Sequence, residues 1–371
     1  MDLSLPTFLQ NLSNPPFLII SLLVLGVVFV NGWTDAPNAI ATAVSTRCIK
    51  PKAAIVMAAV FNLIGVLVMM LLSSAVADTI SKMVDFGEVP QGSSSNPLLV
   101  AVCAAMFAIV VWAVAAWFFG IPTSESHALI AGLSGSALAM GGASGINWDQ
   151  WVKVIYGIVL STLLGFVLSF VLSKTVNLIL KWVQNTRAAQ EGSLSKNGAD
   201  RFFTYGQNVA AAFMAFMHGA QDGQKFIGVF VLAMFVANSS GATEMTGSIG
   251  LDASSLWLIF LVAITMGVGT SIGGYRIIKT VGMDMVKLKK NQGFASDLAA
   301  SVCLLISTFT GLPVSTTHTK TTAMMGAAVA KRPKSLNMNV VKEMFMAWFL
   351  TFPGCGLIAY LMTLLFSYLF G

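Results

Sequence analysis

Long apolar blocks, separated by short polar stretches, run along almost the whole chain. Each block approaches or exceeds the roughly 20 apolar residues that a helix needs to span a bilayer. The blocks fall at about 17–46, 53–77, 98–119, 121–140, 151–173, 202–237, 256–278, 294–312, 313–330 and 343–370. The block 53–77 carries no charge and does not alternate, unlike the strands of a membrane barrel. The pattern therefore predicts an all-α polytopic membrane protein.

The composition supports this class. Of the 371 residues, 56% are apolar and 10% are charged, against about 25% charged residues in soluble domains. Water-soluble enzymes and nucleic-acid binders are therefore excluded. The net charge of +6 says little about the substrate, because basic residues gather in the cytoplasmic loops of membrane proteins. The four scattered cysteines indicate neither a disulfide framework nor a metal centre.

The longest hydrophilic stretch divides the chain into two halves with five blocks each. It runs over 174–201, between a first half at 1–173 and a second half at 202–371. Because five crossings is an odd number, we expect the second half to be inverted relative to the first. The fold class predicted is thus two inverted-topology repeats of about five spanning segments, with broken or re-entrant helices meeting at a central site.

The basic residues predict the orientation of the protein. They cluster after the first block, in 174–201, at 279–290 and at 331–342, and such loops are cytoplasmic. We therefore expect 174–201 and Arg332 to lie inside the cell, and Ser94, Ser240 and both termini to lie outside. The membrane expected is the plasma (inner) membrane.

Two short motifs are repeated in the same order in both halves. Residues 31–38 read Asn-Gly-Trp-Thr-Asp-Ala-Pro-Asn and match 218–225, His-Gly-Ala-Gln-Asp-Gly-Gln-Lys, at an offset of 187. Residues 120–127 read Gly-Ile-Pro-Thr-Ser-Glu-Ser-His and match 311–318, Gly-Leu-Pro-Val-Ser-Thr-Thr-His, at an offset of 191. The two similar offsets indicate an internal duplication.

The first repeated motif places a carboxylate within each long apolar block. Insertion scales give a cost of roughly 2.5–3.5 kcal/mol for an aspartate at the centre of a membrane helix. Asp35 and Asp222 therefore need partners, which discontinuous helices in both blocks would supply. The alternative is that a buried aspartate pairs with Lys225 or Arg276 and serves packing alone.

The second repeated motif is typical of a helix start, with proline in the first turn and hydroxyls that cap backbone amides. Helix N-termini bind anions, above all phosphate-like oxyanions. Inverted symmetry would point two such ends at one volume, with helix capping and no ligand as the alternative. The phosphate ligands expected there are Thr123, Ser124, Ser126, Ser315, Thr316, Thr317, Gln224 and Lys225.

Carboxylates beside an anion site indicate that a cation binds between them. Carboxylate and amide oxygens are hard donors suited to Na⁺, and no thiolate or imidazole cluster points to a transition metal. The cation ligands expected are Asp35, Asn38, Thr34, Gln221, Asp222 and Glu125, with Na⁺ held by Asp35, Asn38 and Asp222. Glu125 could instead carry a proton or lie in a solvated loop. Beyond co-transported Na⁺, we expect no cofactor.

Four further polar residues lie within apolar blocks. Lys320 is a counter-ion or extends to a membrane interface, and the pattern assigns no role to Asp297. We expect His127 and His318 to be hydrogen-bonding helix residues, with a proton relay as the alternative.

At the two motifs the sequence resembles the inorganic phosphate transporter (PiT) family, whose duplicated signature is Gly-x-Asn-Asp-x-x-Asn. Here Thr34 and Gln221 replace the asparagine that precedes each aspartate. The resemblance spans nearly the whole chain and implies symport of inorganic phosphate with Na⁺ or H⁺. We therefore expect a Na⁺-coupled phosphate symporter, not an enzyme, with no nucleic-acid partner and a homodimer as a candidate assembly. The alternatives are an H⁺-coupled phosphate or sulfate permease of the same family and, from a different class, an anion channel.

Overall fold

A computed structural model describes residues 2–84, 96–188, 196–238 and 253–370. Within these ranges the regular structure is helical, apart from two isolated β-bridges. The α-helices are α1 (Leu5–Asn11), α2 (Pro15–Thr34), α3 (Pro37–Ser45), α4 (Pro51–Leu72), α5 (Ala75–Ser81), α6 (Asn96–Phe119), α7 (Glu125–Gly141), α8 (Trp148–Ala188), α9 (Lys196–Asn238), α10 (Leu256–Ile272), α11 (Tyr275–Lys279), α12 (Lys290–Phe309), α13 (Thr316–Val329) and α14 (Met338–Phe370).

The predicted all-α polytopic class is confirmed. Among the described residues, seven helical segments are long and apolar enough to cross a membrane, or eight if the bent pair of α10 with Tyr275–Met285 counts as one span. Helices α9 and α13, which carry the polar motifs of the second half, are not among these apolar segments. Together the helices account for all ten predicted blocks. The division into inverted repeats at 1–173 and 202–371 stays a prediction.

The first block is broken near its middle, as expected. Helix α2 ends at Thr34 and α3 begins at Pro37, so Asp35 and Ala36 lie in the break. Proline has no N–H to continue the helical ladder, and its ring clashes with the preceding turn. A second break separates α10 from α11, where the chain bends by 66° and Gly273 adopts a φ of +78°.

One expectation about regular structure is wrong. The second-half counterpart of the broken block is not broken, because α9 runs without interruption from Lys196 to Asn238. The motif at 218–225 contains no proline, so nothing removes a helical hydrogen bond there. The hydrophilic stretch 174–201 that divides the chain is helical in both described parts, because α8 extends to Ala188 and α9 begins at Lys196. Residues 174–188 contain neither glycine nor proline, the residues that most disfavour a helix.

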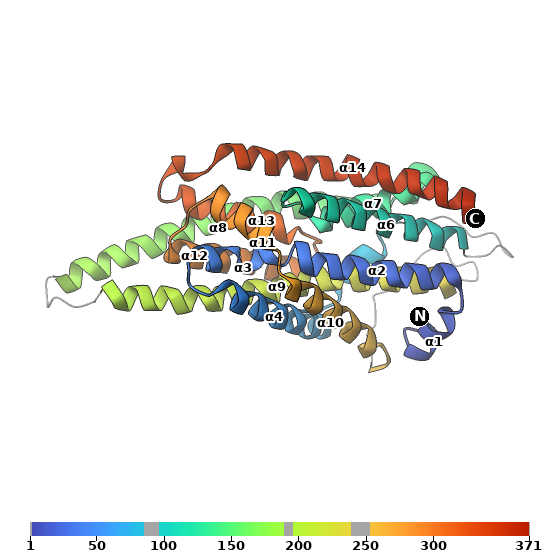
Figure 1. The fold of residues 1–371 in the computed structure, drawn as a ribbon, viewed down its shortest axis with the longest axis horizontal. Coiled ribbons are helices and arrows are strands. Elements are labelled where there is room, and N and C mark those ends of the chain that lie inside the picture. Colours follow the sequence, from blue (N-terminus) through green and yellow to red (C-terminus); the bar gives the residue numbers. More distant parts are fainter. Residues whose placement is uncertain (1, 85–95, 189–195, 239–252, 371) are drawn as a thin grey trace.

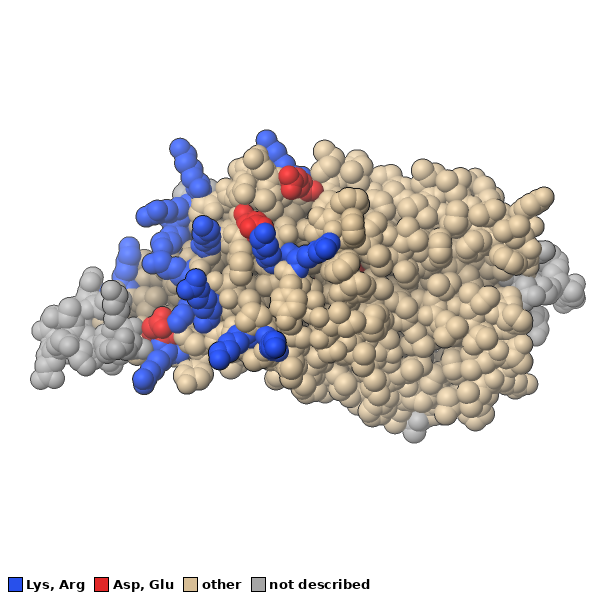
Figure 2. Space-filling view, in the orientation of Figure 1, with Lys and Arg blue, Asp and Glu red and all other residues tan. Residues whose placement is uncertain are grey.

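The long helices lie side by side along one axis of the molecule (Figure 1), with α9 packed against α4, α12, α5 and α3. The paired ends of α8 and α9 project at one end, and both chain termini lie at the other. On the face shown in Figure 2, lysine and arginine side chains gather at the α8–α9 end. The basic end and the chain termini therefore lie at opposite ends of the molecule, and the expectation that the basic end is cytoplasmic stays a prediction. Ser94 and Ser240 lie outside the described residues.

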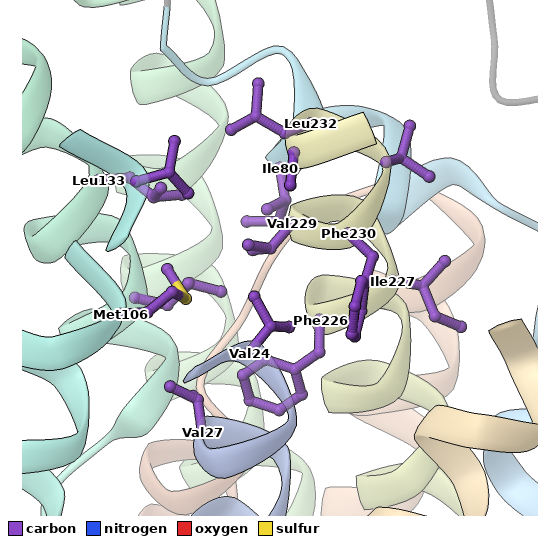
Figure 3. Close-up of a cluster of buried hydrophobic side chains, with 14 of the residues drawn as sticks. Val24, Val27, Ile80, Met106, Leu133, Phe226, Ile227, Val229, Phe230 and Leu232 are labelled. Carbon is purple, nitrogen blue, oxygen red and sulfur yellow. The ribbon is translucent and has the colours of Figure 1, made fainter. Parts of the chain in front are cut away.

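A large apolar core surrounds the part of α9 that faces the termini (Figure 3). Phe226 and Val229 of α9 pack in it with Val24 of α2, Met106 of α6 and Leu133 of α7. This core fixes α9 against the elements that carry the repeated motifs.

Glycines let α9 and α4 approach closely at residues 218–225, the second copy of the first repeated motif. A Cβ atom built on Gly219 would lie 2.2 Å from the carbonyl oxygen of Asn62, and one on Gly65 would lie 2.0 Å from that of Phe216. Any side chain at either position must push the helices apart. The close contact brings Asn62 Oδ1 to 3.0 Å from His218 Nδ1.

We predict that Gly65→Ala lowers the free energy of unfolding by about 1–3 kcal/mol, the usual cost of overpacking a close-packed contact. Thermal unfolding of the purified protein in detergent measures the change. Gly26→Ala in α2 is the matched control, because a Cβ there meets no atom within 4 Å. Equal melting temperatures for the two variants would contradict the packing account.

Candidate functional site

The two repeated aspartates meet inside the helical bundle. Asp35 lies in the break between α2 and α3, and Asp222 lies midway along α9. Both are buried. Their carboxylates and the His218 imidazole each offer one ligand atom, and these atoms all lie within 4.8 Å of one another. Side chains from distant parts of the chain thus form one compact polar site.

Each aspartate contacts a hydroxyl from the helix start of the opposite half. Thr317 Oγ1 donates to Asp35 Oδ1, and Ser126 Oγ lies 3.5 Å from Asp222 Oδ1. The offset of 191 makes Ser126 and Thr317 equivalent positions. The two halves therefore interlock at the site, with each providing one carboxylate and one hydroxyl.

Helices α7 and α13 both begin at this site with the same capping geometry. Ser124 Oγ accepts the backbone N–H of His127 at 3.2 Å, and Ser315 Oγ accepts that of His318 at 3.1 Å. The predicted helix starts and hydroxyl caps are thus confirmed, whereas Pro122 and Pro313 precede the caps and do not lie in the first helical turn. Ser124 and Ser315 thus cap their own helices, whereas the hydroxyls of Ser126 and Thr317 contact the aspartates.

Both carboxylate oxygens of Asp222 have donors. Lys225 Nζ lies 2.6 Å from Oδ1. On the other oxygen, Asn31 Nδ2 donates at 3.1 Å, Thr316 Oγ1 lies at 3.4 Å, and His218 Nε2 lies at 3.4 Å. A buried carboxylate with an ammonium partner and further donors is electrostatically satisfied.

Asp35, in contrast, keeps an unsatisfied oxygen. Its Oδ1 accepts from Asn38 Nδ2 at 2.9 Å and from Thr317, whereas Oδ2 has no hydrogen-bond partner. Asn38 Oδ1, Glu125 Oε2 and Asn31 Oδ1 are also buried and unpaired. Buried polar atoms without partners are costly and rare. A group of oxygen acceptors without donors has the chemistry of a cation site.

Glu125 is buried, so the solvated-loop alternative is wrong. It is the first residue of α7 and is 2% exposed. Its Oε1 contacts Thr34 Oγ1, the residue before Asp35. Thr34, Thr123 and Glu125 line one small cavity beside this contact. Glu125 is therefore a site residue, on the same side as Asp35.

The two glutamines of residues 218–225, the second copy of the first repeated motif, make backbone contacts at the edge of the site. Gln221 Nε2 donates to the carbonyl oxygen of Leu312 at 3.2 Å, and its Oε1 is unpaired. Gln224 Oε1 accepts the backbone N–H of Val76 at 3.1 Å, and its Nε2 is unpaired. Each glutamine thus keeps one free polar atom for a ligand.

Of the two basic residues considered as aspartate partners, Lys225 is one and Arg276 is not. Arg276 Nη1 donates to the carbonyl oxygen of Phe118 at 2.5 Å, and its guanidinium lies over the Trp117 ring. The packing alternative therefore applies only to the ion pair of Asp222 with Lys225.

The two repeated histidines pack on each other. The His127 and His318 rings meet edge to face with centroids 4.2 Å apart. Within the described residues, neither ring nitrogen of His127 has a hydrogen-bond partner, and neither does Nε2 of His318. The expected hydrogen-bonding role is therefore wrong for His127. The aromatic rings of Phe352 and Trp348 pack against the pair and replace polar partners.

A second buried polar cluster joins α3, α9, α12 and α13. Lys320 Nζ forms an ion pair with Asp297. Thr42 Oγ1 lies 2.6 Å from Asp297 Oδ2 and 3.0 Å from Lys320 Nζ. Gln207 Nε2 donates to Asp297 Oδ2 at 2.6 Å. The sequence flagged the two charges, but Thr42 and Gln207 carry no motif that would have marked them.

Known proteins match this chain over most of its length. Residues 31–359 match the model of the phosphate transporter family. A probable low-affinity inorganic phosphate transporter of Bacillus subtilis is 36% identical over 348 residues, which cover 92% of this chain and 96% of the relative. One of Mycobacterium tuberculosis (strain ATCC 25618 / H37Rv) is 33% identical, covering 94% of this chain and 77% of the relative. A solved structure of a sodium-dependent phosphate transporter shares the fold, with a TM-score of 0.79 at 22% identity over 95% of this chain and 98% of the other.

We predict that Lys320→Met lowers the free energy of unfolding by about 3–5 kcal/mol, because it leaves the Asp297 carboxylate buried without a countercharge. The double variant Asp297→Asn with Lys320→Met should recover most of this loss, since no charge remains and the new amide can still bond Thr42 and Gln207. Chemical denaturation in detergent measures both variants. Strictly additive losses would contradict a coupled ion pair.

Proposed function

This chain belongs to the phosphate transporter family, and we propose that it is a secondary active symporter that moves inorganic phosphate into the cell together with Na⁺. We place it in the plasma membrane, with the basic 174–201 region cytoplasmic and both termini outside. The family transports its substrate and performs no enzymatic reaction on it.

The observation that carries the proposal is the group of unpaired oxygens around Asp35. Asp35 Oδ2, Asn38 Oδ1 and Glu125 Oε2 are buried acceptors without donors, and hard cations prefer such carboxylate and carbonyl oxygens. We assign the Na⁺ to these residues, with Thr34 beside them. Asp222 faces the same volume and contributes negative charge, and the free Oε1 of Gln221 adds an acceptor.

Phosphate binds in this proposal where the N-termini of α7 and α13 meet. The free N–H groups and the positive end of a helix dipole attract an oxyanion. Ser126, Thr316 and Thr317 supply hydroxyl donors, and Ser124 and Ser315 contribute through the helix starts that they cap. Gln224 and Thr123 belong to the set expected from the sequence, whereas the three donors of the Lys225 ammonium are used by Asp222, Ser126 and the carbonyl oxygen of Val314.

A cation next to the anion site also supplies the driving force. Each negative charge that enters a cell against a potential of 100 mV costs about 2.3 kcal/mol, so phosphate alone is opposed by the membrane potential. Co-bound Na⁺ offsets the charge and adds its own gradient. Because the two ions bind side by side, each raises the affinity for the other.

A second candidate coupling ion is H⁺, and the burial of Glu125 favours it. Glu125 is 2% exposed, and its Oε2 has no hydrogen-bond partner. Protonation would remove the cost of a buried carboxylate charge without a basic partner. Glu125 is therefore the group that would carry a coupled proton. A sulfate permease and an anion channel have no comparable observation in their favour.

We predict that proteoliposomes containing the wild-type protein concentrate labelled phosphate when a Na⁺ gradient is imposed, and that Asp35→Asn abolishes this dependence because it removes the charged cation ligand. Asp149→Asn, which changes an exposed acid at the start of α8, is the control and should transport normally. Glu125→Gln mimics the protonated side chain and should keep Na⁺-driven uptake. Uptake by the wild type that follows a pH gradient and ignores Na⁺ would favour the H⁺ alternative.

We also predict that Ser126→Ala and Thr317→Ala raise the apparent KM for phosphate by about 10- to 150-fold, the equivalent of one charge-assisted hydrogen bond of about 1.5–3 kcal/mol. Competition with sulfate should change little, since a hydroxyl donates equally to either oxyanion. Ser144→Ala, at an exposed position away from the site, serves as the control. A wild-type KM in both variants would show that phosphate binds elsewhere.

A further inference from the structure

The motif residue three positions after each aspartate differs in charge between the two halves. Asn38 follows Asp35, and Lys225 follows Asp222, at the shared offset of 187. The equivalent positions therefore hold a neutral amide in one half and an ammonium in the other.

These two residues make the same hydrogen bonds. Asn38 Nδ2 donates to Asp35 Oδ1 and to Thr317 Oγ1, each at 2.9 Å. Lys225 Nζ donates to Asp222 Oδ1 and to Ser126 Oγ, each at 2.6 Å. In both halves the side chain bridges its own aspartate to the hydroxyl at the helix start of the opposite half.

The Lys225 ammonium makes a third bond that Asn38 does not make. Its Nζ lies 2.6 Å from the carbonyl oxygen of Val314, so a carboxylate, a hydroxyl and a backbone carbonyl surround it at the same distance. These are the oxygen ligands that a hard cation takes in proteins. An ammonium has three donors and no acceptor, so the three oxygens use all of them.

The two aspartates also differ in whether their oxygens have hydrogen-bond partners. Asp35 Oδ2 and Asn38 Oδ1 have no partner, whereas neither oxygen of Asp222 is unpaired. The negative charge in one half is thus balanced by a side chain, and that in the other half is not.

We propose that the Lys225 ammonium permanently occupies the second of two equivalent cation sites, so that the transporter couples phosphate movement to monovalent cations through the Asp35 site alone. The inference rests on the proposed cation-coupled transport and specifies that only one of the two equivalent sites, the one at Asp35, binds Na⁺. Replacing Lys225 with asparagine removes the ammonium and opens the second site to Na⁺. Replacing Asn38 with lysine places an ammonium in the Asp35 site and closes it.

The test compares the ratio of labelled Na⁺ to labelled phosphate taken up by proteoliposomes. Lys225→Asn gives the second half the residue of the first and should raise the ratio by one Na⁺ per phosphate relative to wild type, with a steeper dependence of uptake on Na⁺ concentration. Lys225→Met is the matched control. It removes the charge without supplying an oxygen ligand, and we expect the ratio in any residual uptake to stay at the wild-type value.

The reciprocal variant Asn38→Lys places an ammonium beside Asp35, and we expect phosphate uptake that no longer responds to Na⁺. An unchanged ratio in Lys225→Asn, or a normal Na⁺ response in Asn38→Lys, would overturn the inference. Equilibrium binding of labelled Na⁺ to purified protein gives an independent readout, in which wild type should bind one ion fewer than Lys225→Asn. A wild-type protein that takes up phosphate without any Na⁺ dependence would instead refute the proposed function, so the two failures are distinguishable.

Discussion

Charge balance around buried carboxylates is the constraint on which the rest of this structure depends. Four acidic side chains are buried among the described residues, and two buried lysines accompany them. Lys225 pairs with Asp222, and Lys320 pairs with Asp297. Asp35 and Glu125 have no basic partner there, and both carry an unpaired oxygen. Because an uncompensated buried charge is strongly unfavourable, these two unbalanced carboxylates are the reason we propose that a cation binds beside them.

Beyond the central site, equivalent positions of the two halves differ in polarity. The offsets of 187 and 191 map the polar cluster of Thr42, Gln207, Asp297 and Lys320 onto Val229, Ile20, Met106 and Leu129. These four counterparts are buried in the apolar core of Figure 3. One framework thus carries an ion pair and its hydrogen bonds on one side of the site and a dry hydrophobic core on the other.

The sequence predicted much of this arrangement because its strongest signals are physical requirements. Apolar blocks must form helices in a bilayer, and the serine of each repeated turn caps a helix, as Ser124 in α7 and Ser315 in α13 show. The uninterrupted course of α9 was missed because a duplicated motif suggests a duplicated break. Pro37 has no counterpart at position 224, where a glutamine continues the helix. Thr42 and Gln207 were missed because single polar residues on long helices give no periodic signal, and only the tertiary fold brings them to Asp297.

The most direct test of the account is a structure determined with Na⁺ and phosphate bound, at a resolution that shows the coordination of the cation. The account predicts an ion in contact with Asp35 Oδ2 and Asn38 Oδ1, while Lys225 Nζ remains on Asp222 and Ser126. An ion bound between Asp222 and Ser126 with Lys225 displaced, or phosphate bound with no cation near Asp35, would contradict it.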